Sequence, residues 1–229
     1  PHPRIPDPLW SRGLGDVYKR QGLIWASIVR SPHAHAVIKN IDTSEAEKVD
    51  GVFAVMTGKD LPKLADSWID HGEGTENISW SSENIMGTKK ALYKGHAVAA
   101  VAAVDRYVAD YAASKVKVEY EVLESVTNVE DATKENAPIL LEDLVGDHIG
   151  EKVSNTNIAS ITRHEFGDPD KAFKDAVHVV EKTFTLQMVH QGYIEPHNAT
   201  AHWDEDDRIK VWTSTQGAFP VRTSTAAIL

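Results

Sequence analysis

The densest group of reactive side chains lies at residues 190–202, where an apolar run gives way to a polar loop and then resumes. Its sequence, HQGYIEPHNATAH, holds three histidines and Glu195, and Gly192 and Pro196 are typical of a turn. Loops at the end of a buried sheet commonly carry cofactor contacts. Two interpretations stay open here: contact with a cofactor, or a zinc site for hydrolysis built on the His190–His202 cluster.

A second polar group follows at residues 214–222, with the sequence STQGAFPVR. An apolar strand pattern ends before it, and Pro220 favours the first turn of a helix. Gln216 and Gly217 directly precede that helix start, where free N–H groups favour anionic or oxo ligands. From these residues alone, a cofactor contact and a simple helix entry both remain open.

Two further clusters invite a metal interpretation. In a strand, His33 and His35 would point to the same face and could ligate a metal ion, but no third ligand lies nearby. The acidic run 204–207, DEDD, is typical of a solvated hairpin turn. We therefore predict a structural or interface role for the histidine pair, and no metal site.

The elements that position these groups are predicted from hydrophobic periodicity. In the first half we expect strands at 23–29, 36–41, 52–56, 96–104 and 115–122, a short helix at 42–49, and a long loop at 62–90. Asp105 is expected to cap a helix after the fourth strand. The buried face of that helix is predicted to hold Val104, Tyr107, Val108, Tyr111 and Ala112.

The second half begins with a connector, residues 124–157, that contains a short helix at 129–134. Asp168 and Pro169 predict the cap and first residue of a later helix, with Ala172, Phe173 and Ala176 on its apolar face. Strands are expected at 158–166, 177–188, 198–203 and 208–214. This mixture of strands and helices predicts an α+β fold.

The overall composition restricts the function classes. The chain has 229 residues, a formal net charge of −10 and no cysteine. An acidic chain is a poor partner for nucleic acid, and without cysteine it can hold no disulfide or iron–sulfur cluster. No apolar run reaches about 18 residues, so no membrane span is expected. Residues 1–21 are rich in proline and basic, and DVYKRQ resembles a sequencing-adaptor translation; we predict a non-native or disordered tail there.

Four stretches of the chain resemble one enzyme family, that of the xanthine dehydrogenase and aldehyde oxidase molybdopterin-binding large subunits. The resemblance is to the branch of aerobic-type carbon monoxide dehydrogenase and 4-hydroxybenzoyl-CoA reductase. RSPHAHAVI (30–38) and YKGHAVAAVAAVDRYVADYAASKVKVEYEVL (93–123) are similar to its α/β-hammerhead domain. HQGYIEPHNATA (190–201) and STQGAFPVR (214–222) are similar to the start of its molybdopterin-binding domain. The resemblance implies a hammerhead domain at 22–123 and a truncated molybdopterin-binding domain at 158–229.

The resemblance also implies an activity and its cofactors. The family oxidises or hydroxylates aldehydes, N-heterocycles and related substrates with oxygen from water, and some relatives run the reductive direction. The implied cofactor is molybdenum–molybdopterin, in the cytosine dinucleotide form. FAD and 2Fe-2S clusters are expected on a medium and a small partner subunit, in a cytoplasmic dimer of heterotrimers.

The same resemblance assigns site residues. Gln216 matches the glutamine whose side-chain amide hydrogen-bonds a molybdenum oxo ligand, a task that suits a donor that does not titrate. Glu195 matches a loop glutamate near the active-site end, which implies a role behind the direct contacts or in the substrate channel rather than proton abstraction. Gly217 and Phe219 are expected to supply backbone and wall contacts. The family's GGFGGK-type motif and catalytic glutamate are expected beyond Leu229. We therefore expect the chain alone to bind no molybdenum and to have no turnover.

Two alternatives from other function classes remain at this stage. One is a non-catalytic binding or assembly module that uses the hammerhead domain alone. The other is the metal-dependent hydrolase built on the His190–His202 cluster. Sequence downstream of Leu229 would separate the first from the enzyme, and zinc-dependent hydrolysis that survives mutation of Gln216 would favour the second.

Overall fold

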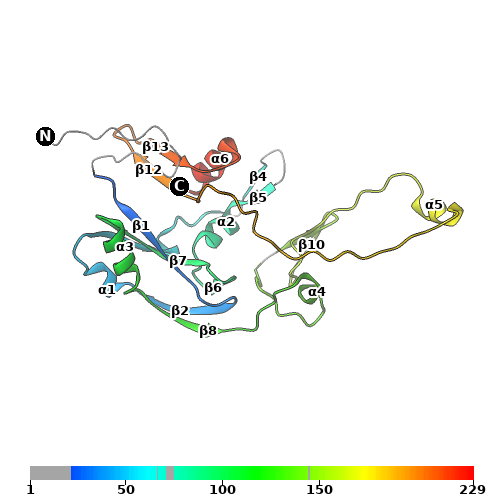
Figure 1. Cartoon of the computed structure of the whole chain (residues 1–229), viewed down its shortest axis with the longest axis horizontal. Coiled ribbons are helices and arrows are strands. Elements are labelled where there is room, and N and C mark those ends of the chain that lie inside the picture. Colours follow the sequence, from blue (N-terminus) through cyan, green and yellow to red (C-terminus); the bar gives the residue numbers. More distant parts are fainter. Residues whose placement is uncertain (1–21, 66, 71–74, 144) are drawn as a thin grey trace. The chain divides into compact units, whose positions relative to one another are not determined.

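The computed structural model describes residues 22–229 apart from 66, 71–74 and 144 (Figure 1). The chain divides into two compact units, which are described separately. The first contains the described residues up to Ser125 together with Ile194–Leu229, and the second is Val126–Tyr193. The expected tail at 1–21 lies outside the described residues. The elements of both units form an α+β fold, as predicted.

An antiparallel sheet with the strand order β1-β7-β3 forms the centre of the first unit. Its strands are β1 (Trp25–Arg30), β7 (Ala97–Ala103) and β3 (Val52–Thr57), close to the predicted ranges. The middle strand, AVAAVAA, buries Val98 and Val101 completely. Its small alanines allow a helix to approach the sheet closely.

A second antiparallel sheet has the order β6-β2-β8. It consists of β6 (Lys90–Ala91), β2 (Ala36–Asp42) and β8 (Lys117–Val122). The predicted alternation along β8 is confirmed, because Val118 and Tyr120 are half-buried while Glu119 and Glu121 are exposed. The short helix α1 (Ser44–Glu47) follows β2, as expected, and its Ala46 packs in a fully buried cluster with Val101 and Ala112.

Helix α3 (Arg106–Ala113) begins where the sequence predicts, but it buries only part of the predicted face. Asp105 Oδ1 accepts a hydrogen bond from the Val108 backbone N–H at 2.9 Å, which confirms the cap. The predicted face is confirmed at Ala112, which is buried, and Val108 is half-buried. It is wrong for the tyrosines, because Tyr107 is 86% and Tyr111 54% exposed, and the second buried residue is Ala109. Both stripes have helical spacing, and the alanine stripe lets the helix backbone lie nearer the sheet than tyrosines would.

The predicted loop at 62–90 is also wrong, because this segment contains a hairpin, a helix and β6. A 3₁₀ helix, η1 (Gly58–Asp60), precedes it, and β4 (Trp68–Asp70) pairs with β5 (Thr75–Asn77). Helix α2 (Ile78–Ile85) starts at a cap in which Asn77 Oδ1 accepts from the Trp80 N–H at 3.0 Å. Ile78 is only 2% exposed. The helix is short and its sequence, ISWSSENI, is too polar for a clear apolar period.

The second unit has a small sheet with the order β10-β9-β11 and two helices. These are β9 (Gly146–His148), β10 (Glu151–Val153), β11 (Ser160–Ile161), α4 (Val129–Ala132) and α5 (Pro169–Asp175). The cap at Asp168 is confirmed by a 2.9 Å hydrogen bond from the Lys171 N–H. The hairpin between β9 and β10 corrects the prediction of a connector with only one short helix. Its two-residue turn has positive φ at both Ile149 (55°) and Gly150 (86°), the pattern of a type I′ turn.

Two long strands predicted in this region are not formed. Only Ser160–Ile161 of the range 158–166 is paired, and residues 177–188 pair with no described strand. Phe184 and Leu186 are 83% and 90% exposed, and the expected apolar face of α5 is open, with Phe173 64% exposed. Alternation indicates a strand only if a neighbouring edge completes the hydrogen bonds, and the described residues supply none here.

The carboxy-terminal part of the first unit is a hairpin followed by a helix. Strands β12 (Ala199–Trp203) and β13 (Ile209–Thr213) pair antiparallel, and α6 (Ala218–Ile228) follows. The acidic run between the strands is their turn, as predicted, and Asp204 Oδ1 accepts from the Arg208 N–H at 3.0 Å. None of the helices in the described ranges has the length and apolarity needed to cross a membrane.

Candidate functional site

The β12–β13 hairpin brings the two polar motifs of the first unit together. Asn198 directly precedes β12, and its carbonyl oxygen accepts from Thr213 Oγ1 at 3.0 Å and from the Ser214 N–H at 3.4 Å. Ser214 Oγ in turn accepts from the Asn198 N–H at 3.4 Å. The loop that carries Glu195 and the segment that carries Gln216 therefore leave the same end of one hairpin.

The start of α6 is open to an anionic or oxo ligand. Gly217 is the N-cap, and no side chain of the described residues caps the helix there. The Gly217 N–H donates to Thr215 Oγ1 at 3.0 Å, and Pro220 has no N–H to satisfy. The first-turn N–H groups of Ala218 and Phe219 thus lack a side-chain cap, which is the condition under which a helix N-terminus attracts negative charge.

The predicted site residues are accessible rather than buried. Glu195 and Gln216 are exposed, Phe219 is 79% exposed, and Gly217 is half-buried. A neutral amide donor beside an uncapped helix start forms a donor set that suits oxygen atoms of a cofactor. The residues present thus fit the molybdopterin group that the sequence implies, although their part in binding it stays a prediction.

The histidines of the cluster are divided between the two units. His190 lies in the second unit, where its Nε2 is 3.1 Å from Tyr193 Oη and its Nδ1 accepts from the Gly192 N–H at 3.1 Å. His202 is an exposed residue of β12. Within the described ranges, no three His, Cys, Asp or Glu side chains lie close enough to hold a metal ion. No observation on these residues therefore favours the hydrolase interpretation.

The His33–His35 pair precedes the strand predicted at 36–41. Residues 32–35 form a bend before β2, so the two rings do not share the face of a strand. His35 is 3% exposed, and its Nδ1 lies 2.6 Å from the Glu124 carbonyl oxygen. His33 packs edge-on against Tyr120, with ring centroids 5.0 Å apart, and burial raises the pKa of Tyr120. These contacts join β2 to the end of β8, which is a structural role.

His96 is a third structural histidine that the sequence singles out only as a strand start. It is 1% exposed, and its Nδ1 accepts from the Leu92 N–H at 3.2 Å. Nδ1 is therefore unprotonated and Nε2 carries the hydrogen, which it donates to the Asn84 carbonyl oxygen at 2.9 Å. Tyr93 stacks on the ring with centroids 4.5 Å apart. His96 thereby links α2, the following loop and β7.

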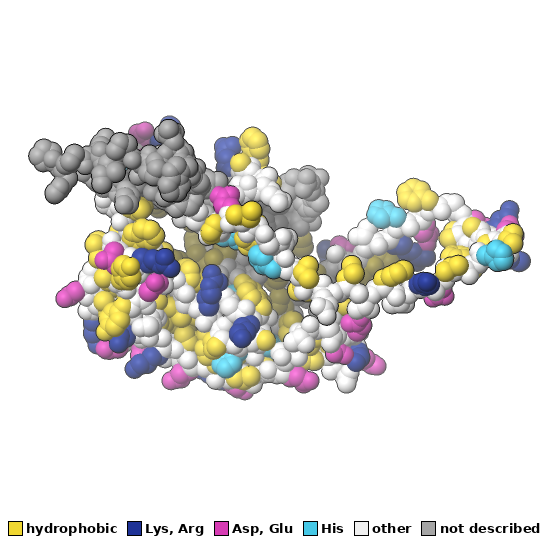
Figure 2. All heavy atoms as spheres, viewed as in Figure 1, with side chains coloured by type: hydrophobic (Ala, Val, Ile, Leu, Met, Phe, Trp, Pro, Cys, Tyr) yellow, Lys and Arg dark blue, Asp and Glu magenta, His cyan; other side chains and the backbone are white. Residues whose placement is uncertain are grey.

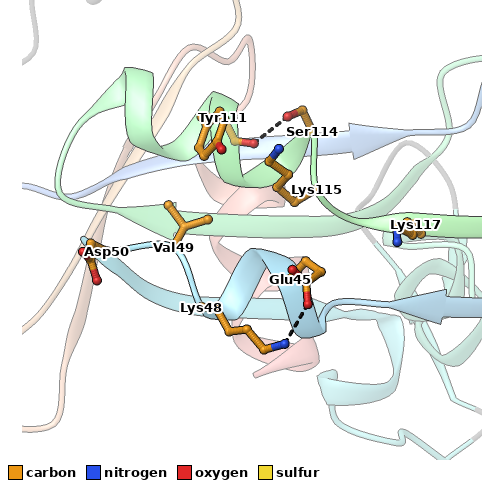
Figure 3. A pocket seen from close by; sticks show the side chains of 8 residues that line it. All are labelled: Glu45, Lys48, Val49, Asp50, Tyr111, Ser114, Lys115 and Lys117. Atoms are coloured by element: carbon orange, nitrogen blue, oxygen red, sulfur yellow. Dashed lines mark hydrogen bonds and ion pairs between the residues drawn. The ribbon is translucent and has the colours of Figure 1, made fainter.

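A groove of about 620 Å³, which sequence reasoning missed, lies between α1, α3 and β8 (Figure 3). It is lined by Glu45, Lys48, Val49, Asp50, Tyr111, Ser114, Lys115 and Lys117. Lys48 Nζ donates to Glu45 Oε1 at 2.6 Å, and this hydrogen bond lowers the pKa of Glu45 and raises that of Lys48. Lys115 Nζ lies 4.6 Å from the centroid of the Tyr111 ring. No spacing rule predicts the groove, because its lining comes from three separate elements.

Comparison with known protein families matches most of the chain. Residues 15–124 match the a/b hammerhead domain of aldehyde oxidase and xanthine dehydrogenase, and residues 149–229 match a molybdopterin cofactor-binding domain.

Similar curated proteins include two bacterial large subunits. The carbon monoxide dehydrogenase large chain of Afipia carboxidovorans is 32% identical over 232 residues, covering 98% of this chain and 28% of the relative. The nicotinate dehydrogenase large molybdopterin subunit of Eubacterium barkeri is 29% identical, with 93% and 45% covered. The chain therefore spans less than half the length of these relatives.

Similar solved structures give the same picture. A Cu,Mo-CO dehydrogenase is 31% identical with a TM-score of 0.72, and the match covers 92% of this chain and 26% of that one. Quinoline 2-oxidoreductase from Pseudomonas putida 86 is 27% identical with a TM-score of 0.72, and 95% and 26% are covered. The similarity thus extends through both units of the described chain.

Proposed function

Because this chain belongs to the aldehyde oxidase and xanthine dehydrogenase family, we propose that it forms part of the large subunit of a molybdenum hydroxylase. In this proposal the hammerhead domain is residues 22–123, a connector follows at 124–157, and the start of the molybdopterin-binding domain is 158–229. One observation carries the proposal: the Asn198–Thr213 and Asn198–Ser214 hydrogen bonds join the two polar motifs at one hairpin end. Both motifs fall in the range that matches the cofactor-binding domain.

The proposed reaction is oxidation of a small electron-poor carbon centre. Carbon monoxide, nicotinate and quinoline appear in the names of similar proteins, which supports an aldehyde, N-heterocycle or related substrate. The bound molybdopterin cofactor, in the cytosine dinucleotide form, would supply the two-electron redox chemistry. Water would supply the oxygen atom in a hydroxylation.

The chain's own residues have positioning roles in this proposal. Gln216 would donate its side-chain amide N–H to an oxygen of the cofactor, and the amide keeps this capacity at any pH because it does not titrate. The Ala218 and Phe219 N–H groups at the start of α6 would donate to the same kind of oxygen-rich group, with Gly217 as the N-cap beside them. Glu195 lies on the adjoining loop, where its carboxylate would line the substrate path. The Phe219 ring would form a wall of the site.

Partner subunits carry the remaining redox centres in this proposal. The chain has no cysteine, so it cannot ligate an iron–sulfur cluster in the usual way. We assign 2Fe-2S clusters to a small subunit and FAD to a medium subunit, in a cytoplasmic dimer of heterotrimers.

The test is metal content and turnover of the full-length large subunit, purified with the subunits encoded beside it. We expect stoichiometric molybdenum by elemental analysis in the wild-type complex. Gln216→Ala is expected to lower kcat by at least about tenfold, since one lost transition-state hydrogen bond costs on that order. Gln187→Ala, an exposed glutamine of the second unit outside both motifs, is the matched control. Absence of molybdenum from the complex, or equal kcat for both variants, would contradict the proposal. A chain of 229 residues that alone retains stoichiometric molybdenum would contradict the expectation that it is inactive by itself.

A further inference from the structure

Helix α6 packs one side against the rest of the first unit and leaves the other side open. Its half-buried residues include Val221, Ser224, Thr225 and Ile228, which the helical period places on one face. Among the described elements, α2 is the one that α6 contacts most, and the two helices lie near each other in Figure 1. Figure 2 shows basic and hydrophobic side chains at the surface over α6. We call Val221, Ser224, Thr225 and Ile228 the α6 packed face.

Helix α2 is attached to the central sheet of the first unit. Its Ile78 and Ser82 are 2% and 4% exposed. At the start of the helix, the Ile78 N–H donates to the Ser67 carbonyl oxygen at 3.0 Å. Near its end, the Asn84 carbonyl oxygen accepts from Nε2 of His96, the residue that directly precedes β7. Helix α6 therefore contacts an element that the central sheet holds in place.

The first turn of α6 depends on packing for its direction. No side chain of the described residues caps the helix at Gly217, so its start lacks the hydrogen bond that commonly fixes a first turn. The Val221 N–H donates to the Gly217 carbonyl oxygen at 3.3 Å and closes that turn. Val221 is also the first residue of the α6 packed face, and it lies only about 6 Å along the helix axis from Gly217. A change at Val221 therefore acts on the turn that follows Gln216.

We propose that Val221 is a positioning residue, whose side chain holds the first turn of α6 in place and thereby orients Gln216 and the N–H groups of that turn. The inference rests on the proposed function, which assigns those groups to the molybdopterin cofactor. Val221 lies on the covered side of the helix, so it acts through these groups rather than by touching the cofactor. A misplacement of about 1 Å in a site can lower a rate about 100-fold, so a small void beneath the first turn has a large expected effect.

The far end of the same face separates positioning from a merely structural role. Ile228 belongs to the α6 packed face but lies about 10 Å along the axis from Val221. Because isoleucine is larger than valine, a structural role predicts that Ile228→Ala lowers stability at least as much as Val221→Ala. A positioning role predicts the opposite order for turnover, because only Val221 lies next to the turn that follows Gln216. Thr223, an exposed residue of α6, is the matched surface control for removal of a β-branched side chain.

Turnover of the full-length large subunit, purified with its partner subunits, gives the first measurement. The probe is whichever of carbon monoxide, nicotinate and quinoline the wild-type complex oxidises. We expect Val221→Ala to lower kcat by at least about tenfold, with molybdenum retained and KM changed by less than about twofold. Val221→Ile refills the space and should restore kcat, while Ile228→Ala and Thr223→Ala should stay within about twofold of the wild type. Equal kcat for Val221→Ala and Ile228→Ala would overturn the proposal.

Amide hydrogen exchange of the same complex gives a readout that does not depend on activity. We expect Val221→Ala to speed exchange of the N–H groups of residues 221–223 by at least about fivefold, because these groups close the first turns of the helix. Ile228→Ala should speed exchange only in the last turn. Unchanged exchange at residues 221–223 in Val221→Ala would overturn the positioning role.

The wild-type complex distinguishes this inference from the proposed function. An active, molybdenum-containing wild-type complex in which Val221→Ala behaves like Thr223→Ala refutes the positioning role alone. A wild-type complex without molybdenum refutes the proposed function, and with it the assignment of the α6 start to a cofactor.

Discussion

Replacing His96 should destabilise the first unit more than any surface histidine, because the ring satisfies two backbone groups of other segments. His96→Phe keeps a planar, slightly larger ring that can stack on Tyr93, but leaves the Leu92 N–H and the Asn84 carbonyl oxygen without this partner. Each buried backbone group left unsatisfied costs roughly 1–3 kcal/mol. We expect His96→Phe to lower the free energy of unfolding by about 3 kcal/mol. His96→Ala adds a void and should cost about 1–2 kcal/mol more.

Urea unfolding followed by tryptophan fluorescence measures this difference. With a slope of about 2 kcal/mol per molar, a loss of 4 kcal/mol moves the midpoint by about 2 M. His164→Ala is the matched control, because His164 is exposed in the second unit. The urea midpoint of His96→Ala should be lower than that of His96→Phe, and both should be well below the midpoint of His164→Ala. If the free energies of unfolding of His96→Ala and His164→Ala differed by less than about 0.5 kcal/mol, the linking role assigned to His96 would be wrong.

Three further predictions concern helix caps and the β9–β10 hairpin. Asp105→Ala should cost about 1 kcal/mol of stability in urea unfolding, because α3 packs on the central sheet, whereas Asp168→Ala should leave the main transition in place, since α5 is exposed. Ile149→Gly should stabilise the second unit by up to about 1 kcal/mol, measured as slower amide exchange in the hairpin, because Ile149 has a φ of 55°. The hydrogen bond from Lys152, followed by that from the Gly150 N–H, lowers the pKa of Asp147. The ionised Asp147 therefore stabilises the hairpin above the usual aspartate pKa, and this stabilisation is lost as the pH falls through the lowered pKa. Chemical-shift titration should show the hairpin loosening below about pH 4 in the wild type, and Asp147→Asn should remove that pH dependence.

Local signals in the sequence predict the framework of the fold well. The caps at Asp105 and Asp168 and the turn at 204–207 form as expected, because each depends on a few adjacent residues. The hairpin predicted from two alternating runs also explains why the motifs of Glu195 and Gln216 meet at one end. The exposure of these two side chains is a tertiary property, and local spacing does not encode it.

The wrong predictions share a physical cause. Periodicity places Tyr107 and Tyr111 on one buried face with Ala112, yet the sheet can accept only the side of α3 that holds Ala109 and Ala112, whose small side chains allow the closer approach. The groove between α1, α3 and β8 escapes sequence reasoning for the complementary reason, because its lining comes from three elements brought together by the fold.

The segment 177–188 shows that an alternating apolar pattern also does not guarantee a paired strand. Phe184, Leu186 and Met188 alternate as a half-buried strand requires, yet they are 83%, 90% and 101% exposed. A hydrophobic pattern indicates which residues of a segment lie on one apolar side, but it does not indicate which surface covers that side. Each of these patterns therefore calls for a measurement of contact in the assembled protein.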